Sequence, residues 1–115
     1  MSHSEHVGWI VELEIRDGKF ELFEELSRDM VESTKHETGT LQYEWNMLDD
    51  KKTVIIIERY ENSLAALIHT TTFAEKFAER FNELAVQTRL FVYGVPDMKL
   101  RQVLRDAGGI FSKPI

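Results

Sequence analysis

Apolar and polar positions alternate along several short stretches of the chain. In residues 7–16 every second position is apolar, which is the period of two expected for a strand with one buried face. Residues 41–47 repeat this alternation, and residues 86–93 also read as a strand. Residues 54–57 are apolar without interruption, so residues 53–61 are predicted to form a central strand covered on both faces. The pattern therefore predicts four strands.

A helical period separates the first two predicted strands. Apolar residues recur every three or four positions after Asp17, a favourable N-cap residue, and acidic residues fill the opposite side. This amphipathic helix is predicted to end near Glu37, with His36 interacting with the helix dipole and Gly39 in a left-handed conformation. A polar turn at residues 49–52 then joins the second and third strands as a hairpin.

The segment between the third and fourth strands is predicted to form two short helices. The first, residues 64–69, is apolar nearly all round, and the threonines after it mark a bend. The second, residues 72–84, is predicted to begin with a capping box between Thr72 and Glu75. The residues expected to define the buried stripe of the first helix are Leu64, Leu67 and Ile68.

The order of these elements is βαββαβ, which is the ferredoxin-like arrangement of an α+β fold. We expect an antiparallel four-stranded sheet with helices on one face. Residues 1–6 are predicted to be a flexible N-terminal tail and residues 7–96 the ferredoxin-like domain. Residues 97–115 are predicted to be a C-terminal helix and tail that pack on the same domain.

The sheet face without helices is partly apolar around the third strand and needs a cover. We therefore expect a homodimer whose interface buries on the order of 800 Å² per chain. Elution at monomer size across micromolar concentrations in gel filtration would contradict this expectation. The polar residues predicted to lie on this face are Glu12, Glu14, Gln42, Glu44, Asn46 and Arg59.

Composition excludes several classes of function. The chain has 115 residues and a net charge of −6, without a run of lysines or arginines at either end, so we expect one domain and no nucleic-acid partner. The longest apolar run, residues 64–68, is far shorter than the roughly 20 residues of a membrane helix, so we expect no membrane partner. The chain has no cysteine, which excludes thiolate chemistry and fits a cytoplasmic protein.

His69 is the candidate for acid–base chemistry. It is the histidine inside a predicted ordered element near aromatic residues, and an unperturbed pKa of roughly 6.5 suits a general base at neutral pH. However, it lies about 100° round the helix from the predicted buried stripe, which favours a solvent-facing position. A helix C-terminus would also favour its protonated form. A catalytic role and a capping or surface role both remain open.

Aromatic residues could line a pocket near His69 or could simply fill the core. Tyr43 and Trp45 share one face of the second strand, where core packing and a pocket role are both open. Glu58 is expected to form an ion pair with Arg59 or Arg89, or alternatively to orient a substrate hydroxyl. The residues that could supply the pocket wall are Trp9, Tyr43, Trp45, Tyr60, Phe73 and Phe77.

Other catalytic patterns are not found in the sequence. His3 and His6 form an H-x-x-H pair in the N-terminal tail, but it has no third ligand, so we expect no metal site. The glycines never form a phosphate-binding loop.

Three short motifs resemble the antibiotic biosynthesis monooxygenase domain family, whose quinol monooxygenase-like members form dimeric α+β barrels. Gly18 and Lys19 match a turn that leads into the first helix. The E-x-G-x-L-x-Y motif corresponds to Glu37, Gly39, Leu41 and Tyr43, and the E-x-[WY] motif to Glu58 and Tyr60, followed by His69 on the next helix. The resemblance covers most of residues 7–95, and its motifs specify the family better than the reaction.

The sequence departs from some family patterns. Tyr60 stands where many members have tryptophan, and Ala74 or Glu75 takes the place of a second histidine. Neither the asparagine and tryptophan pair of members acting on aromatic polyketides nor the residue set of the haem-degrading relatives is recognisable. His69 stands where the latter have tryptophan.

The resemblance implies a monooxygenase that uses no flavin, haem or metal and acts on a quinol or related electron-rich aromatic with molecular oxygen. Such a substrate can reduce oxygen once it is deprotonated, so the protein needs to supply a base, orient the ring and exclude water. The expected catalytic residues are His69, Tyr43 and Tyr60, with Trp9, Trp45, Phe73 and Phe77 binding the substrate. Isomerisation of a small carbonyl compound and binding of a hydrophobic ligand or haem without turnover remain alternatives.

Overall fold

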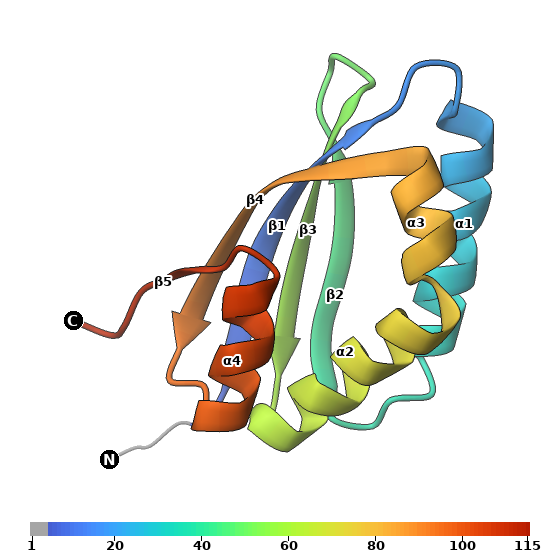
Figure 1. Cartoon of the computed structure of the whole chain (residues 1–115). Helices are drawn as coiled ribbons and strands as arrows, with labels where there is room; N and C mark the ends of the chain where they lie inside the picture. The colour runs from blue at the N-terminus through green and yellow to red at the C-terminus, as the bar shows by residue number, and fades with distance from the viewer. Residues whose placement is uncertain (1–4) are drawn as a thin grey trace.

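The computed structural model describes residues 5–115 and has two layers, a five-stranded sheet and helices on one of its faces (Figure 1). The strand order is β2-β3-β1-β4-β5, with antiparallel pairing among the first four strands and parallel pairing of β4 with β5. The elements are β1 (Val7–Ile15), α1 (Phe20–Thr34), β2 (Thr40–Met47), β3 (Thr53–Tyr60), α2 (Ser63–Lys76), α3 (Ala78–Leu84), β4 (Ala85–Gly94), α4 (Met98–Asp106) and β5 (Ile110–Phe111).

The predicted ferredoxin-like α+β fold is confirmed, but the expectation of four strands is wrong. The C-terminal tail adds β5 next to β4, and Ser112 donates from both its main-chain N and its Oγ to the carbonyl of Val92. A two-residue strand is too short to produce a recognisable period, so the sequence pattern did not reveal it.

The predicted bend at the three threonines is absent, because α2 continues through them to Lys76. Thr72 Oγ1 donates to the carbonyl of Ile68 inside the helix instead of forming a capping box. The helix breaks at Phe77, whose φ of −127° is not helical, and α3 follows directly. The predicted buried stripe is also wrong, since Leu64 and Ile68 are more than half exposed.

The ends of α1 differ from the prediction as well. The N-cap position is Lys19, with no side-chain cap, while Asp17 and Gly18 form the preceding turn with Gly18 at a φ of +74°. The helix ends at Thr34, before His36 and Glu37. Gly39 has no positive φ in this structure, so its expected left-handed conformation is not observed.

The core lies between the inner face of the sheet and the helices. The inner face contributes alternate residues of β1, β3 and β4, as the period of two requires. From the helical layer, Leu26 of α1, Ala66 of α2 and Leu100 of α4 are fully buried. The C-terminal helix therefore shares the core of the preceding domain.

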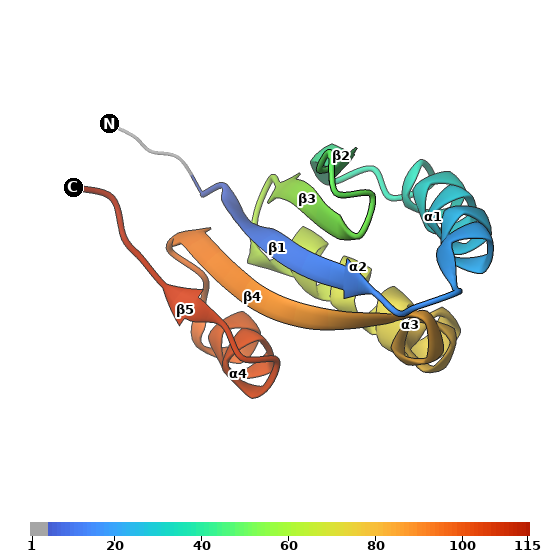
Figure 2. The same cartoon turned by 90° about the horizontal axis from the view of Figure 1, so that it is seen from above.

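The outer face of the sheet is not covered by any helix of residues 5–115 (Figure 2). It carries exposed apolar side chains, including Ile10 and Phe91, between charged residues such as Glu12 and Arg89. Within the described part of the chain, no helix has the length and apolar character needed to cross a membrane.

Candidate functional site

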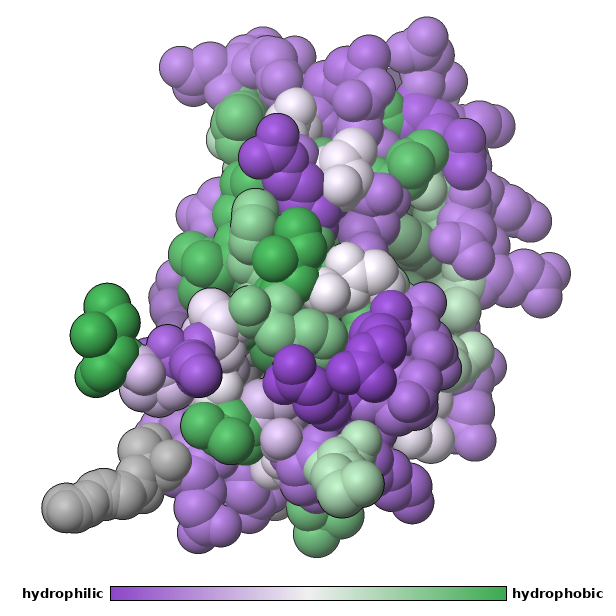
Figure 3. All heavy atoms as spheres, turned by 60° about the vertical axis from the view of Figure 1, so that its left-hand side comes forward, coloured by the Kyte–Doolittle hydropathy of each residue, from purple (hydrophilic) through white to green (hydrophobic). Residues whose placement is uncertain are grey.

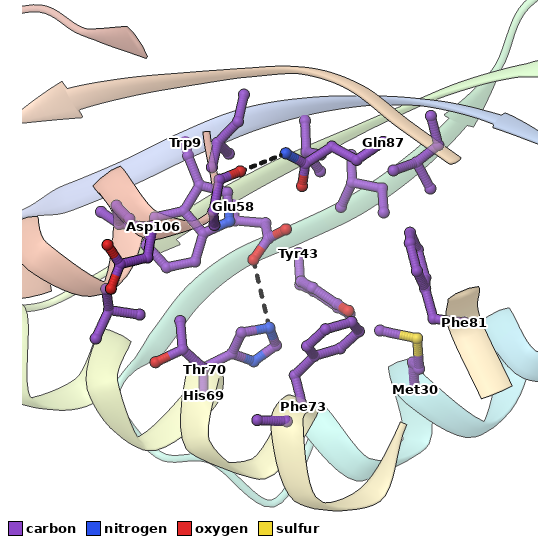
Figure 4. A pocket seen from close by; sticks show the side chains of 18 of the residues that line it. Trp9, Met30, Tyr43, Glu58, His69, Thr70, Phe73, Phe81, Gln87 and Asp106 are labelled. Atoms are coloured by element: carbon purple, nitrogen blue, oxygen red, sulfur yellow. Dashed lines mark hydrogen bonds and ion pairs between the residues drawn. The ribbon is translucent and has the colours of Figure 1, made fainter. Parts of the chain in front are cut away.

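A cavity of about 590 Å³ lies between the inner face of the sheet and the helices (Figure 4). Most of its lining is apolar or aromatic and includes Trp9, Met30, Tyr43 and Phe73. Its ionisable groups include Glu58 from β3 and His69 from α2, which point toward each other across the cavity wall. A pocket with apolar walls and a few convergent polar groups is typical of a small-molecule site.

Three ionisable side chains form a continuous row, in which Glu58 and His69 line the cavity and Glu37 contacts His69 without lining it. His69 Nδ1 lies 2.9 Å from Glu37 Oε1, and His69 Nε2 lies 3.4 Å from Glu58 Oε1. The side chains of His69, Glu37 and Glu58 are only 9%, 11% and 6% exposed. The imidazole is therefore held between two buried carboxylates, and each ring nitrogen faces one of them.

The strand period explains the position of Glu58. It follows Val54 and Ile56 at intervals of two, so its side chain points to the inner face with theirs. Tyr60 comes next in the same phase, and its hydroxyl donates to Glu58 Oε1 at 2.6 Å. The main-chain carbonyl of Glu58 accepts a hydrogen bond from the hydroxyl of Tyr93 at 2.7 Å. Both ends of the residue are thus fixed.

The start of α2 determines the position of His69. The side chain of Asn62 caps the helix by accepting from the main-chain N of Ala65 at 2.9 Å. Small residues at Ala65 and Ala66 let the helix approach the sheet closely, and His69 follows them on the same buried side. The surface role that the sequence left open for His69 is therefore not what the structure shows.

Glu37 reaches His69 from the loop between α1 and β2. Its Oε1 also accepts a hydrogen bond from Thr40 Oγ1 at 3.0 Å. A Cβ atom at Gly39 would lie 2.5 Å from the Cβ of Ala65, which is closer than real Cβ atoms approach. Glycine at this position therefore allows the loop to pass close to α2 and to place the carboxylate beside the imidazole.

The surroundings shift the pKa values of this row. Burial alone would lower the pKa of His69, but the hydrogen bond with Glu37 and the charge of Glu58 outweigh it and raise that pKa. Burial raises the pKa of Glu58, against the opposing effect of His69. Burial also acts to raise the pKa of Glu37, yet the contacts with His69 and Thr40 lower it overall. His69 is therefore protonated over a wider pH range than a free imidazole.

The tyrosines near this row keep their protons. Burial, followed by the nearby charge of Glu58, raises the pKa of Tyr43 and of Tyr60 far above the usual range. The rings of Tyr43 and His69 meet edge to face with centroids 5.1 Å apart. Tyr43 can therefore act as a hydrogen-bond donor at the cavity, whereas Tyr60 already donates to Glu58.

The structure brings four of the seven predicted site residues to the cavity wall, namely His69, Tyr43, Trp9 and Phe73. Tyr60 lies behind Glu58 and is fully buried. Trp45 packs against Phe23 and Tyr43, and its Nε1 is buried without a hydrogen-bond partner. Phe77 ends α2 and does not line the main cavity.

Glu37 was expected only as part of a family motif, and for Glu58 an ion pair with an arginine was preferred over the alternative of orienting a substrate hydroxyl. The expected ion pair of Glu58 with Arg59 or Arg89 is wrong, because Glu58 points inward and Arg89 lies 3.8 Å from Glu12 on the outer face. Its phase with Val54 and Ile56 was a usable signal, since a carboxylate on a buried face is costly unless it is paired. Glu37 had no signal from strand or helix phase, because it lies in a loop, and only its place in the family motif singled it out.

No group of three or more His, Cys, Asp or Glu side chains within residues 5–115 is arranged to hold a metal ion. Of the H-x-x-H pair, His3 lies outside the described residues.

Solved structures with a similar fold span most or all of this chain. MupZ from Pseudomonas fluorescens is 23% identical with a TM-score of 0.88, and the match covers 100% of this chain and 89% of MupZ. PA3566 from Pseudomonas aeruginosa is 23% identical with a TM-score of 0.64, covering 80% of this chain and 93% of that one. Rv0793 from Mycobacterium tuberculosis is 20% identical with a TM-score of 0.67, and the match covers 76% of this chain and 91% of Rv0793. At these identities the likeness shows the fold and not the reaction.

Among curated proteins, none matches the chain significantly. The model of the antibiotic biosynthesis monooxygenase family matches residues 7–74, which include Glu37, Glu58 and His69. The chain belongs to the antibiotic biosynthesis monooxygenase family.

Proposed function

We propose that this protein is a cofactor-independent monooxygenase that oxidises a quinol or a related electron-rich hydroxylated aromatic. The observation that carries the proposal is the row Glu58–His69–Glu37 at the wall of a cavity with aromatic and apolar lining. Such a wall suits an aromatic ring, and the buried row suits removal of a phenolic proton.

In this proposal Glu58 is the base. Its carboxylate lines the cavity, and its raised pKa makes it a better proton acceptor than an exposed glutamate once it is ionised. His69, with both nitrogens facing carboxylates, remains protonated and stabilises the phenolate as a cation. Tyr43 donates a hydrogen bond that orients the substrate oxygen, and Tyr60 positions the carboxylate of Glu58. This division of roles replaces the expected use of His69 as the base.

The row also supplies a route for the proton. After Glu58 has accepted a proton, Nδ1 of the His69 imidazolium can release its own proton to Glu37, which leaves a neutral imidazole with its proton on Nε2. Glu37 lines a separate hollow of about 270 Å³ next to Gly39 and Leu64, and it does not line the main cavity. The proton can therefore leave without crossing the substrate pocket.

The deprotonated substrate then reduces oxygen itself, so the proposed reaction needs no flavin, haem or metal. One oxygen atom enters the ring and the other leaves as water, while the quinol loses four electrons and becomes a hydroxyquinone. The contribution of the protein is the base, the fixed orientation and the exclusion of bulk water.

A second candidate is isomerisation of a small carbonyl compound. It is favoured by one observation, namely that His69 and Glu58, whose pKa values are both raised, lie 3.4 Å apart in the cavity wall. An isomerase needs such a pair, because one group removes a proton while the other stabilises the oxygen of the enol.

Oxygen consumption distinguishes the two reactions. The protein is incubated with a panel of one-ring and two-ring quinols in an oxygen electrode, and the product is analysed by mass spectrometry under ¹⁸O₂. We expect catalysed oxygen uptake and incorporation of one ¹⁸O atom. The absence of uptake above the spontaneous rate across the panel would contradict the monooxygenase and favour proton transfer without oxygen.

We also propose that two copies pair through their outer sheet faces. The support is the uncovered face with exposed Ile10 and Phe91. Sedimentation velocity should give a dimer at micromolar concentration, and Phe91→Lys should shift it to monomer. Met98→Lys, at an exposed position on α4, is the matched control. A monomer in the unmodified protein would contradict the pairing.

A further inference from the structure

The cavity reaches the surface along a rim of exposed residues, whereas Glu58 and His69 are buried in its wall. Figure 3 brings the side of the molecule with α4 and β5 forward, and here polar side chains surround a group of apolar ones. The rim is formed by residues of α2, α3, β4 and α4, so its width depends on how these elements are held together. The residues of the rim are Ala74, Asn82, Gln87, Val103, Asp106 and Ala107.

A β-bulge in β4 aims Gln87 into the cavity. Glu12 of β1 is paired with Arg89 and Leu13 with Gln87, so that Thr88 is an extra residue without a partner in β1. Counted back from the buried Leu90, an unbroken period of two would place Gln87 on the outer face of the sheet. The extra residue changes this phase, and Gln87 lines the cavity instead. Bulges near active sites commonly re-aim a side chain in this way.

The hydroxyl of Thr88 holds the bulge. Its Oγ1 donates to Oε2 of Glu12 at 2.6 Å and lies 3.1 Å from the main-chain carbonyl oxygen of the same residue. A valine at position 88 would have nearly the same shape and would suit a strand, but it could form neither contact. The bulge is therefore fixed by the hydroxyl group and not by the volume of the side chain.

Gln87 in turn holds the end of α4 at the rim. Its Nε2 atom donates to the carbonyl of Ala107 at 2.8 Å, which joins β4 to α4 (Figure 4). Ala107 is the C-cap residue of α4, and Gly108 leaves the helix with a φ of +86°. The last carbonyls of a helix have no partner within the helix, so the amide of Gln87 satisfies one of them. Two parts of the rim are thus connected by a single side chain.

We propose that Thr88 is a positioning residue that keeps bulk water out of the cavity. Its hydroxyl holds the bulge, the bulge aims Gln87, and Gln87 holds the end of α4 at the rim. The consequence for catalysis rests on the proposed function. The access of small molecules to the cavity does not, and it can be measured without turnover.

Water in the cavity should change the products of the proposed reaction. In the complete reaction the quinol gives four electrons to oxygen, and the products are a hydroxyquinone and water. If water reaches the site, partly reduced oxygen can be protonated and leave early. The quinol then loses only two electrons and two protons, and the products are a quinone and hydrogen peroxide. A wider rim should therefore raise the yield of hydrogen peroxide per oxygen molecule consumed.

Quenching of Trp9 fluorescence by acrylamide measures access to the cavity. Trp9 lines the cavity and is 5% exposed. The other tryptophan, Trp45, does not line it, and Trp45→Phe loses no hydrogen bond because Nε1 has no partner. In the Trp45→Phe background, Gln87→Ala and Thr88→Val should each raise the quenching constant at least twofold. The double variant should show no further increase, since both changes remove the same connection.

Two variants test whether the hydroxyl of Thr88 is responsible. Thr88→Ser keeps the hydroxyl and should behave like the unmodified protein. Thr53→Val is the matched control, because it removes a 2.7 Å hydrogen bond from a threonine hydroxyl to Asp50 at a position that does not line the cavity. Circular dichroism and thermal unfolding check that each variant folds. Gln87→Ala, at an exposed position, carries the test if Thr88→Val does not fold.

The same variants are then compared in the oxygen electrode with the quinol of the panel that reacts fastest. Gln87→Ala and Thr88→Val should raise the yield of hydrogen peroxide at least threefold, and Thr53→Val should leave it unchanged. Equal quenching constants in the Trp45→Phe protein with and without Gln87→Ala would overturn the proposal. An unchanged peroxide yield despite increased quenching would overturn the positioning role. Increased quenching in variants of a protein that consumes no oxygen would support the closed rim and contradict the monooxygenase.

Discussion

Glu58 and Glu12 are the same residue type on neighbouring strands of one sheet, yet their surroundings are opposite. Glu58 lies on the inner face with its side chain 6% exposed, next to His69 and Tyr60. Glu12 lies on the outer face with its side chain 33% exposed, and Arg89 is 3.8 Å away. Burial raises the pKa of Glu58, because water no longer stabilises its charge. The difference in surroundings comes from the face of the strand, not from the residue type.

The largest difference should appear in catalysis. We expect Glu58→Gln to lower the rate of oxygen uptake by about 10²- to 10⁴-fold, the range lost when a general base is removed. Glu12→Gln should leave the rate within about twofold, since Glu12 does not line the cavity. Comparable rates for both variants in the oxygen electrode would remove Glu58 from the proposed mechanism.

The cations next to the two glutamates should differ in their effect on stability. His69→Leu leaves two buried carboxylates without their partner, so we expect a loss of about 3 kcal/mol in the free energy of unfolding. Arg89→Leu removes an exposed contact and should cost less than about 1 kcal/mol. Urea titration measures both values. Equal losses would mean that the buried contacts of His69 contribute no more to the free energy of unfolding than the exposed contact of Arg89.

Two tyrosines hold Glu58 from opposite faces and sharpen the comparison. Tyr60→Phe removes the 2.6 Å hydrogen bond to the carboxylate, at a cost of about 2 kcal/mol because the acceptor can be charged. It should also move the pH dependence of oxygen uptake toward higher pH, since the carboxylate loses a donor. Tyr93→Phe removes a bond to the main-chain carbonyl, should cost about 1 kcal/mol and should leave the pH profile unchanged. Identical pH profiles in the two variants would contradict this difference.

The smallest expected effect is the pH dependence of the stability of the row. The pKa of His69 is raised above 6.5 on folding, so its contribution is complete below pH 6.5 and is lost as the pH rises through the folded value. The pKa of Glu37 is lowered below 4.5, so its contribution is present above pH 4.5 and is lost as the pH falls through the folded value. The stability difference between the unmodified protein and His69→Leu, measured in urea, should therefore be larger at pH 5.5 than at pH 8.5. A difference that grows with pH would contradict the assignment.

The first two strands follow from the period of two that burial of one face imposes on a strand, and the third strand follows from its unbroken apolar run. The helix boundaries were harder to predict. A run of threonines indicates a break in a helix, unless their hydroxyls donate to main-chain carbonyls of the same helix, and the sequence does not show such bonds. Thr72 bonds to the carbonyl of Ile68, and α2 continues. In the same helix, Leu64 and Ile68 are exposed although they are apolar, because Ala65 and Ala66 make the closer contact with the sheet.

The site was only partly predictable for a related reason. Residue type was sufficient to single out His69, Tyr43, Trp9 and Phe73, which line the cavity, whereas the helical phase wrongly favoured a solvent-facing His69. The partnership of His69 with Glu37 could not, because it joins a helix to a loop 32 positions earlier in the chain. A pattern of neighbouring residues in the sequence cannot predict a side-chain contact that depends on how closely a loop and a helix pack.

Gly39 makes that contact available. The 2.9 Å between Glu37 and His69 is set by the clearance between a loop and a helix, and a single methyl group would fill this clearance. A design that transfers the three ionisable residues to another sheet would therefore also need a glycine at the position that corresponds to Gly39. Gly39 is therefore a structural requirement of the site, although it has no side-chain functional group.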